Sequence, residues 1–475
     1  MFGNDDGYVI GPRVEAKAAL DNFRDRIWTR CGLRLQEEKT ELFSGRDLNQ
    51  EELFGMKKAG VMLEDGFAPG FICYGIPVGC PRYVSHMLRE RAEEIVKEAE
   101  EITEILCEDS QALWVVLHRS LAHKFDYHLS LSYPSDIRPV AAYLDSALWS
   151  MLEKAAGQQI PRTNQGLGYE CILDIPVNSM MANNSFQELF VRTPIKLRGF
   201  GLRSLVQTSP TAFIGGLERS LSAFGGEEGI CRKLEHLLGG GEQWWRHLLD
   251  SGTRTGEEFK ESWTFLQQEA GQCAEFIGIQ LDGTLAVGPD VAVELKEGDN
   301  SRQALTEQRE GLREAVLREA LLRHPNQTAR PAIAYPQLDK LSTAWKLSLP
   351  CSTTGLTSPV FKEMLALHLF LPSLACKAVV GQRVGAGGAV ASPFGDEVMC
   401  AHLPGDSWRW RHDDIKLCII NICNDSKVRA EAEVFGRFRD LLPPHLFAAG
   451  GQLHHGRQRV GLTPDLLLRL PTPDT

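Results

Sequence analysis

The sequence lacks the features that mark several large classes of protein. No stretch approaches the roughly 20 consecutive apolar residues of a membrane helix, and no apolar run near Met1 resembles a signal peptide. The 12 cysteines are scattered and include no Cys-x-x-Cys pair, which is typical of a reducing compartment. We therefore expect an intracellular protein, nuclear or cytoplasmic, with no membrane partner.

Positive charge is also in short supply. Lys and Arg together number 51 against 62 Asp and Glu, so the formal net charge is −11. This balance argues against one large basic face but is compatible with a local basic groove. The glycine run at Gly385, Gly387 and Gly388 is not followed by Gly-Lys-Ser/Thr, which excludes a phosphate-binding loop there.

What the sequence does contain is typical of a globular chain. The 475 residues are 43% hydrophobic and 24% charged, and this length predicts about two to four domains.

The most distinctive stretch lies at the start. Asn4-Asp5-Asp6-Gly7 is followed by the β-formers Tyr8-Val9-Ile10, which predicts a hairpin with two adjacent carboxylates at its turn. Like charges at this separation repel, and a divalent metal removes that cost. A solvated turn is an equally good interpretation of these residues alone.

Three further segments follow in a short run. Residues 16–30 have apolar side chains at helical spacing, and the segment 32–41 that follows contains Lys39. Residues 71–79 read as a strand and turn in which Gly75 and Gly79 let another backbone approach closely. Taken alone, Lys39 is better explained as a surface lysine.

In this order, the segments resemble the last palm motifs of a reverse transcriptase of the non-LTR (LINE-like) retrotransposon type. The resemblance implies that Asp5 and Asp6 are the catalytic carboxylates and bind Mg²⁺ or Mn²⁺. It implies that the segment 32–41 holds a short strand ending in Lys39, and that Lys39 meets the phosphates of the incoming dNTP. It also implies that residues 71–79 grip the DNA primer on its RNA template. Gly3 departs from the pattern, because the family has Tyr or Phe there.

Helical patterns dominate the middle of the chain. Amphipathic stripes at 83–106, 110–129 and 134–152 predict three helices in a bundle, the last with Ser135 and Asp136 as possible caps. In the family a helical thumb lies here. Five cations of this region could contact phosphates, although ion pairs with neighbouring glutamates are the preferred interpretation: Arg89, Arg91, Lys97, Arg119 and Lys124.

Beyond the bundle, Gly199-Phe200-Gly201-Leu202 resembles a stretch that follows the thumb in these elements. Four cations surround it, and an exposed turn is favoured over phosphate contact: Arg192, Lys196, Arg198 and Arg203. We expect connector helices near 211–224, 230–239, 256–279 and 301–323.

The C-terminal part resembles the region before and within a restriction-like endonuclease. Pro464-Asp465 precedes an apolar strand at 466–468, and Glu431 and Glu433 are expected in an amphipathic helix. The resemblance implies that Asp465 and Glu433 help to hold a nuclease metal, although no acid-x-Lys follows Asp465. Four zinc-capable side chains lack the spacing of a known finger, so no zinc site is expected: Cys400, His402, His412 and Cys418.

We therefore expect an α+β chain, mostly α. Its segments would be the C-terminal part of a palm (1–81), a helical thumb (82–157), a mostly helical connector (158–330), and a connector with a truncated endonuclease-like domain (331–475). The expected function is that of a reverse-transcriptase fragment, cut at both ends and inactive alone. The alternatives are a non-catalytic remnant that binds nucleic acid or protein, and a truncated metal-dependent endonuclease.

Overall fold

A computed structural model of the chain describes the following residues: 2–3, 6–36, 39–46, 48–49, 51–162, 185–197, 199–223, 252–277, 301–323, 346, 350, 355–400, 413, 416–417, 420, 429–432, 453–454, 457–458 and 466–469. The chain divides into two compact units, Met1–Leu371 and Pro372–Thr475, and each is described by itself.

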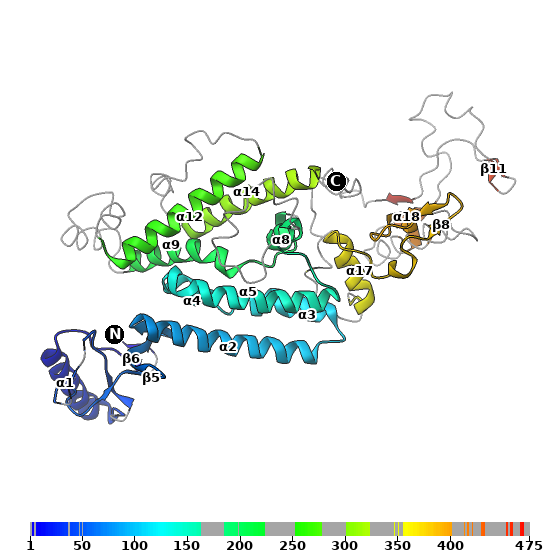
Figure 1. Ribbon diagram of the computed structural model, residues 1–475. Coiled ribbons are helices and arrows are strands. Elements are labelled where there is room, and N and C mark those ends of the chain that lie inside the picture. The colour runs from blue at the N-terminus through cyan, green and yellow to red at the C-terminus, as the bar shows by residue number, and fades with distance from the viewer. Residues whose placement is uncertain are drawn as a thin grey trace, which may run out of the picture. The chain divides into compact units, whose positions relative to one another are not determined.

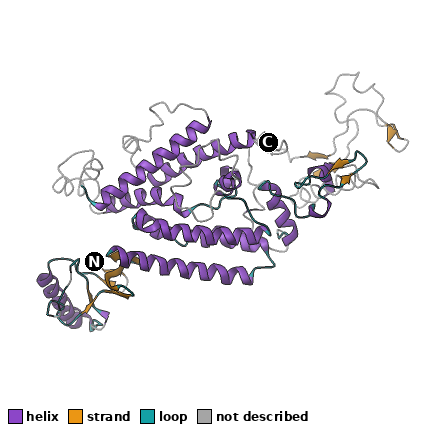
Figure 2. Cartoon of the chain, in the orientation of Figure 1, coloured by secondary structure: helices purple, strands orange, loops and turns teal. Residues whose placement is uncertain are grey.

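The first unit is mostly helical (Figure 1, Figure 2). Its helices are α1 (Arg13–Cys31), α2 (Pro81–Ile105), α3 (Ser110–Arg119), η2 (Leu121–His123), α4 (Asp126–Leu131), α5 (Pro134–Ala156), α8 (Ser185–Arg192), η3 (Ile195–Leu197), α9 (Leu205–Ala223), α12 (Arg254–Ile277), α14 (Ser301–Arg323) and α17 (Ser358–His368). Its strands are β1 (Phe2–Gly3), β2 (Asp6–Gly7), β3 (Glu41–Leu42), β4 (Lys57–Lys58), β5 (Gly60–Leu63), β6 (Gly66–Cys73) and β7 (Ile76–Gly79).

The largest described sheet is the antiparallel meander β5-β6-β7, which leads directly into α2. Gly70 pairs with Gly79, and the ring of Tyr83 at the start of α2 lies against both. A Cβ on Gly70 would overlap that ring, and a Cβ on Gly79 would overlap the backbone of Pro69 and Gly70. The predicted close approach is therefore confirmed at Gly79, whereas Gly75 serves the turn.

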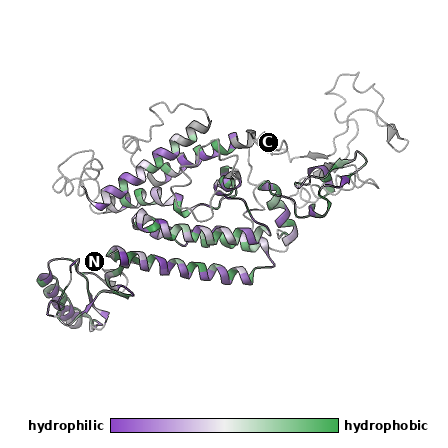
Figure 3. Cartoon of the chain, in the orientation of Figure 1, coloured by the Kyte–Doolittle hydropathy of each residue, from purple (hydrophilic) through white to green (hydrophobic). Residues whose placement is uncertain are grey.

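Helices α2 and α5 pack side by side (Figure 1). Pro81 and Pro134 occupy the first turns, where a missing N–H costs nothing. Hydrophobic and hydrophilic bands recur along α2, as expected for a helix with one apolar and one polar face (Figure 3). The prediction that Ser135 and Asp136 cap α5 is wrong, because the N-cap residue is Tyr133. Ser135 instead donates its backbone N–H to Glu258 of α12, and Asp136 accepts from Arg254 of α12.

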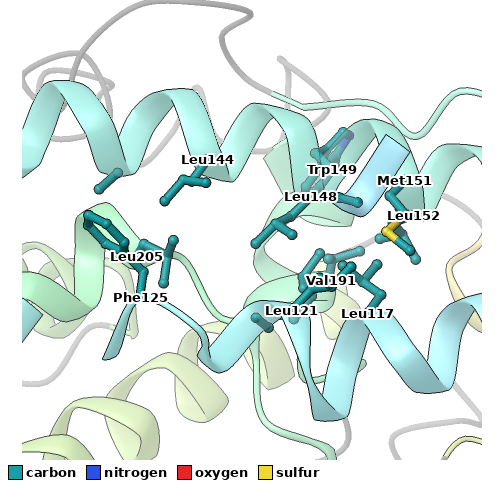
Figure 4. Close-up of a cluster of buried hydrophobic side chains, with 14 of the residues drawn as sticks. Leu117, Leu121, Phe125, Leu144, Leu148, Trp149, Met151, Leu152, Val191 and Leu205 are labelled. Atoms are coloured by element: carbon teal, nitrogen blue, oxygen red, sulfur yellow. The ribbon is translucent and has the colours of Figure 1, made fainter. Parts of the chain in front are cut away.

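The main core lies between α5 and the chain from α3 to α4. Leu144 and Leu148 of α5 face Leu121 and Phe125 across this layer (Figure 4). The single helix expected at 110–129 is wrong, because the chain breaks into α3, η2 and α4 around Ser120. The break leaves a backbone carbonyl, that of Ala122, to accept a hydrogen bond from Arg203.

A smaller core joins α9, α12 and α14. Phe213 and Ile214 of α9 pack with Phe259 and Trp263 of α12. At its edge, the carboxylate of Glu269 in α12 binds two guanidinium groups of α14, those of Arg309 and Arg313. These helices match the expected connector helices at 211–224, 256–279 and 301–323, and the one expected at 230–239 lies outside the described residues.

The second unit has small elements: η5 (Lys377–Val379), β8 (Arg383–Val384), β9 (Ala389–Val390), α18 (Asp396–Cys400), β10 (Arg429–Ala432), β11 (Leu453–His454), β12 (Arg457–Gln458) and β13 (Leu466–Arg469). The predicted strand at 466–468 is confirmed as β13, which pairs antiparallel with β10. The helix expected around Glu431 is wrong, because Glu431 lies in β10 opposite Leu467.

The coarse fold prediction is confirmed: the chain is mostly helical with a few small sheets. The four named segments stay predictions. The strand expected before Lys39 is wrong, since residues 32–36 have no regular structure and Lys39 sits in a turn. Among the described residues, no helix is long and apolar enough to cross a membrane.

Candidate functional site

The candidate site is the hairpin formed by β1 and β2. Gly3 pairs with Asp6 and Phe2 pairs with Gly7 in antiparallel register, so a hairpin forms here as predicted. Asp6 and Gly7 lie in β2 and not in the turn, however, and the strand expected at residues 8–10 is wrong. Asp5 and the side chain of Asp6 lie outside the described residues. Their role as metal ligands therefore stays a prediction.

Tyr8 joins this hairpin to the β6–β7 hairpin. Its hydroxyl donates to the backbone oxygen of Ile72 at 3.3 Å and accepts from the backbone N–H of Tyr74 at 3.3 Å. Its ring centroid lies 5.2 Å from that of Tyr74 and 6.2 Å from that of Phe71. Because only Gly7 separates Tyr8 from Asp6, these contacts bring the carboxylate hairpin beside the turn at Tyr74-Gly75.

The turn itself has an unusual backbone. Tyr74 has φ of 50° and Gly75 has φ of 80°, the left-handed pair of a two-residue hairpin turn. A tyrosine is rarely found there, because its Cβ crowds the following carbonyl. The hydroxyl of Tyr127 in α4 donates to the backbone oxygen of Tyr74 at 3.0 Å, so hydrogen bonds from two tyrosines hold the turn.

Lys39 is exposed, and its backbone N–H donates to the oxygen of Gln36 at 3.0 Å. Its contact with a nucleotide stays a prediction. A short two-stranded parallel ladder follows, with Glu41 opposite Lys57.

Three cations of the helical bundle form ion pairs with glutamates of the same bundle. Arg89 binds Glu93 at 3.0 Å, Arg91 binds Glu94 at 2.7 Å, and Lys124 of the η2–α4 link binds Glu98 of α2. For these three residues, the preferred interpretation as partners of glutamates is confirmed.

The turn at Gly199 is buried, so the expectation of an exposed turn is wrong. Of the four cations, Lys196 is exposed and Arg198 lies outside the described residues. Phe200 and Leu202 are fully buried. Arg192 is buried and donates to the oxygen of Arg203 at 3.0 Å, while Arg203 binds Asp126. The remaining cation with described contacts, Lys196, binds Glu310 of α14 at 2.9 Å.

This stretch ends in an unexpected helix cap. Asp145, in the middle of α5, accepts from Ser204 Oγ at 2.5 Å and from the backbone N–H of Leu205 at 2.9 Å. These are the groups that begin α9, so a buried carboxylate from another helix satisfies them. Arg192 lies 3.7 Å from the same carboxylate.

Sequence reasoning missed a second polar cluster. Lys346 is 1% exposed, and its Nζ donates to the oxygen of Gly199 at 3.0 Å and lies 2.5 Å from Nε2 of His368. Burial lowers the pKa of Lys346 to about 7 and the pKa of His368 well below its usual value. The only signal in the sequence was a lysine set among apolar residues beside Trp345, which is too weak to predict burial.

Several predicted residues of the second unit lie outside the described ones. They are Asp465, Glu433, His402, His412, Cys418 and the side chain of Cys400. Among the side chains that the structure describes, no three or more of His, Cys, Asp or Glu form a group that could hold a metal ion.

No protein-family model, curated protein or solved structure matches this chain.

Proposed function

We propose that this chain is the part of a non-LTR retrotransposon reverse transcriptase that carries the carboxylate hairpin of the palm, the glycine hairpin and the helical thumb. The partners are an RNA template, a DNA primer and a dNTP. Asp5 and Asp6 would hold Mg²⁺ or Mn²⁺, and a metal held there activates the primer hydroxyl and stabilises the departing pyrophosphate.

One observation carries the proposal: Tyr8 connects the two hairpins. Residues 2–8 and 71–79 are more than 60 residues apart in sequence, yet the Tyr8 hydroxyl bonds to Ile72 and Tyr74 at 3.3 Å each. The resemblance implies that these elements lie together at a polymerase centre.

The donor chemistry supports a hard divalent metal. Two adjacent carboxylates on a hairpin offer only oxygen ligands, which Mg²⁺ prefers. The neighbouring surface supports a nucleic-acid partner through exposed aromatic rings, since Tyr74 and Tyr127 are 41% and 50% exposed.

Mn²⁺ binding tests the metal site. We would titrate the full chain with Mn²⁺ and measure the free ion by electron paramagnetic resonance. The variant Asp5→Asn plus Asp6→Asn should lose the tightest site. The control is Glu100→Gln plus Glu101→Gln, which neutralises two adjacent exposed carboxylates on α2.

The proposal is wrong if both double variants bind Mn²⁺ as the unchanged chain does. A second measurement, of primer–template binding with and without Mg²⁺, distinguishes the polymerase proposal from the alternative of a non-catalytic remnant. Primer–template binding that is strong but indifferent to Mg²⁺ and to Asp5→Asn plus Asp6→Asn would favour that alternative.

A further inference from the structure

A lysine without an evident role lies at the junction of three segments of the first unit. The Nζ of Lys346 reaches the oxygen of Gly199 and the imidazole of His368, the last residue of α17. Its backbone oxygen accepts from the indole N–H of Trp114 in α3 at 2.8 Å. One residue therefore connects α3, the turn at Gly199 and α17.

The surroundings of this lysine are mostly aromatic. The Phe200 ring centroid is 5.9 Å from Nζ, and the Phe200 ring in turn lies 3.9 Å from the ring of Trp114. Two imidazoles of the described residues face the cluster, those of His368 from α17 and of His118 from α3, whose ring is 5.1 Å from that of Trp114. Each of them is a base that burial keeps neutral.

We propose that Lys346 and its contacts form a pH-sensitive clamp, which holds α3, the Gly199 turn and α17 together and tightens as the pH rises. A buried ammonium is costly, whereas the same ammonium released into water is well solvated. Proton uptake therefore favours the released state, and proton loss favours the closed clamp.

The direction follows from linkage. The pKa of Lys346 is about 7 in the clamp and 10.5 in the ordinary state, so between these values the released lysine binds the proton that the clamped one has lost. Closing should strengthen about twentyfold between pH 7.5 and 9.0. Below about pH 6 the lysine contributes little further change, because both states are then protonated.

His368 acts in the same direction at lower pH. Its pKa in the clamp lies well below the ordinary 6.5, so released His368 takes up a proton first as the pH falls below 6.5. The clamp is therefore tight in alkaline solution and loosens steadily as the pH falls, first through Lys346 and then through His368. Because protonation of either group favours release, the two groups never oppose one another as the pH changes.

Hydrogen exchange of the full chain tests this inference. Suitable reporters are the amides of Phe200 and Leu202, which donate to Phe190 and Val191, and that of Leu369, which donates to Leu365. After correction for the intrinsic rate, their protection should rise about twentyfold from pH 7.5 to 9.0. Amides of α12 at 262–270 serve as the internal control and should change little.

The variant Lys346→Met removes the titrating group and keeps much of the volume. Its reporter protection should be flat over this range. Reporter protection in the unchanged chain that is flat, or that follows the α12 amides, would overturn the proposal without any variant. An equal slope in Lys346→Met and in the unchanged chain would also overturn it.

Discussion

Replacing Glu269 by alanine should destabilise the packing of α12 on α14 strongly. The Glu269 side chain is 14% exposed, and its oxygens bind Arg309 Nε at 2.5 Å and Arg313 Nε at 2.8 Å. Arg309 and Arg313 are themselves only 10% and 14% exposed. The variant removes the carboxylate that pairs with both guanidinium groups and leaves these two positive charges largely buried. Loss of one partner of a buried ion pair costs about 3–5 kcal/mol.

A matched control lies on the same helix. Glu261 is 60% exposed and lies 3.8 Å from Arg138, so Glu261→Ala removes a surface ion pair. Such pairs contribute about 0–1 kcal/mol. Both variants remove one carboxylate from α12, and the structure predicts very different outcomes.

The assay is urea denaturation with hydrogen exchange of α12 and α14 as the local probe. Glu269→Ala should shift the local midpoint far below that of Glu261→Ala. Replacing all three charged residues by Met or Leu should recover most of the loss, because a well-packed apolar triad avoids desolvation. Equal costs for the two single variants would refute the reasoning.

The ion cluster also predicts a dependence on pH. Burial raises the pKa of Glu269, but Arg309 and Arg313 outweigh it and hold the pKa below 4.5. The contribution to stability is therefore present above about pH 4.5 and is lost as the pH falls through the lower folded-state value. Acid titration of α12 exchange should show this loss, and Glu269→Gln should remove it.

Three further predictions concern the rest of the first unit. Asp145→Ala should cost about 1–3 kcal/mol by urea denaturation, because the N–H of Leu205 loses its buried acceptor, and Asp145→Asn should cost less. Tyr127→Phe should cost about 0.5–1.5 kcal/mol and loosen exchange at the Tyr74 turn, since the hydroxyl no longer holds that carbonyl. Burial lowers the pKa of His118 and of His128 to about 4, so helical circular dichroism should show stability falling between pH 6.5 and 4 and less so in a His118→Gln variant.

Local patterns predicted the long helices well. The stripes at 83–106 and 301–323 correspond to α2 and α14 almost residue for residue, because an apolar face at helical spacing needs no information from distant residues. The break at Ser120 was not predicted, since the apolar spacing continues through it. Only the distant Arg203 shows why a freed carbonyl at Ala122 is useful.

The polar contacts that join segments could not be predicted. Asp145 looks like an ordinary polar residue in a helix, yet it caps a helix about 60 residues away. Lys346 and Gly199 are 147 residues apart, and their contact depends on the folded path of the chain. The order of the two hairpins was visible in the sequence, whereas the role of Tyr8 in joining them was not.

Paramagnetic broadening by Mn²⁺ tests the central claim most directly. The chain has 8 tyrosines, so labelling with [¹⁵N]tyrosine gives a small set of amide signals. A Mn²⁺ ion bound by Asp5 and Asp6 should broaden Tyr8 and Tyr74 first and leave Tyr143 on α5 sharp. The broadening should disappear in Asp5→Asn plus Asp6→Asn. Uniform broadening of all tyrosines, or no broadening of Tyr8 and Tyr74, would contradict a metal-binding polymerase hairpin in this protein.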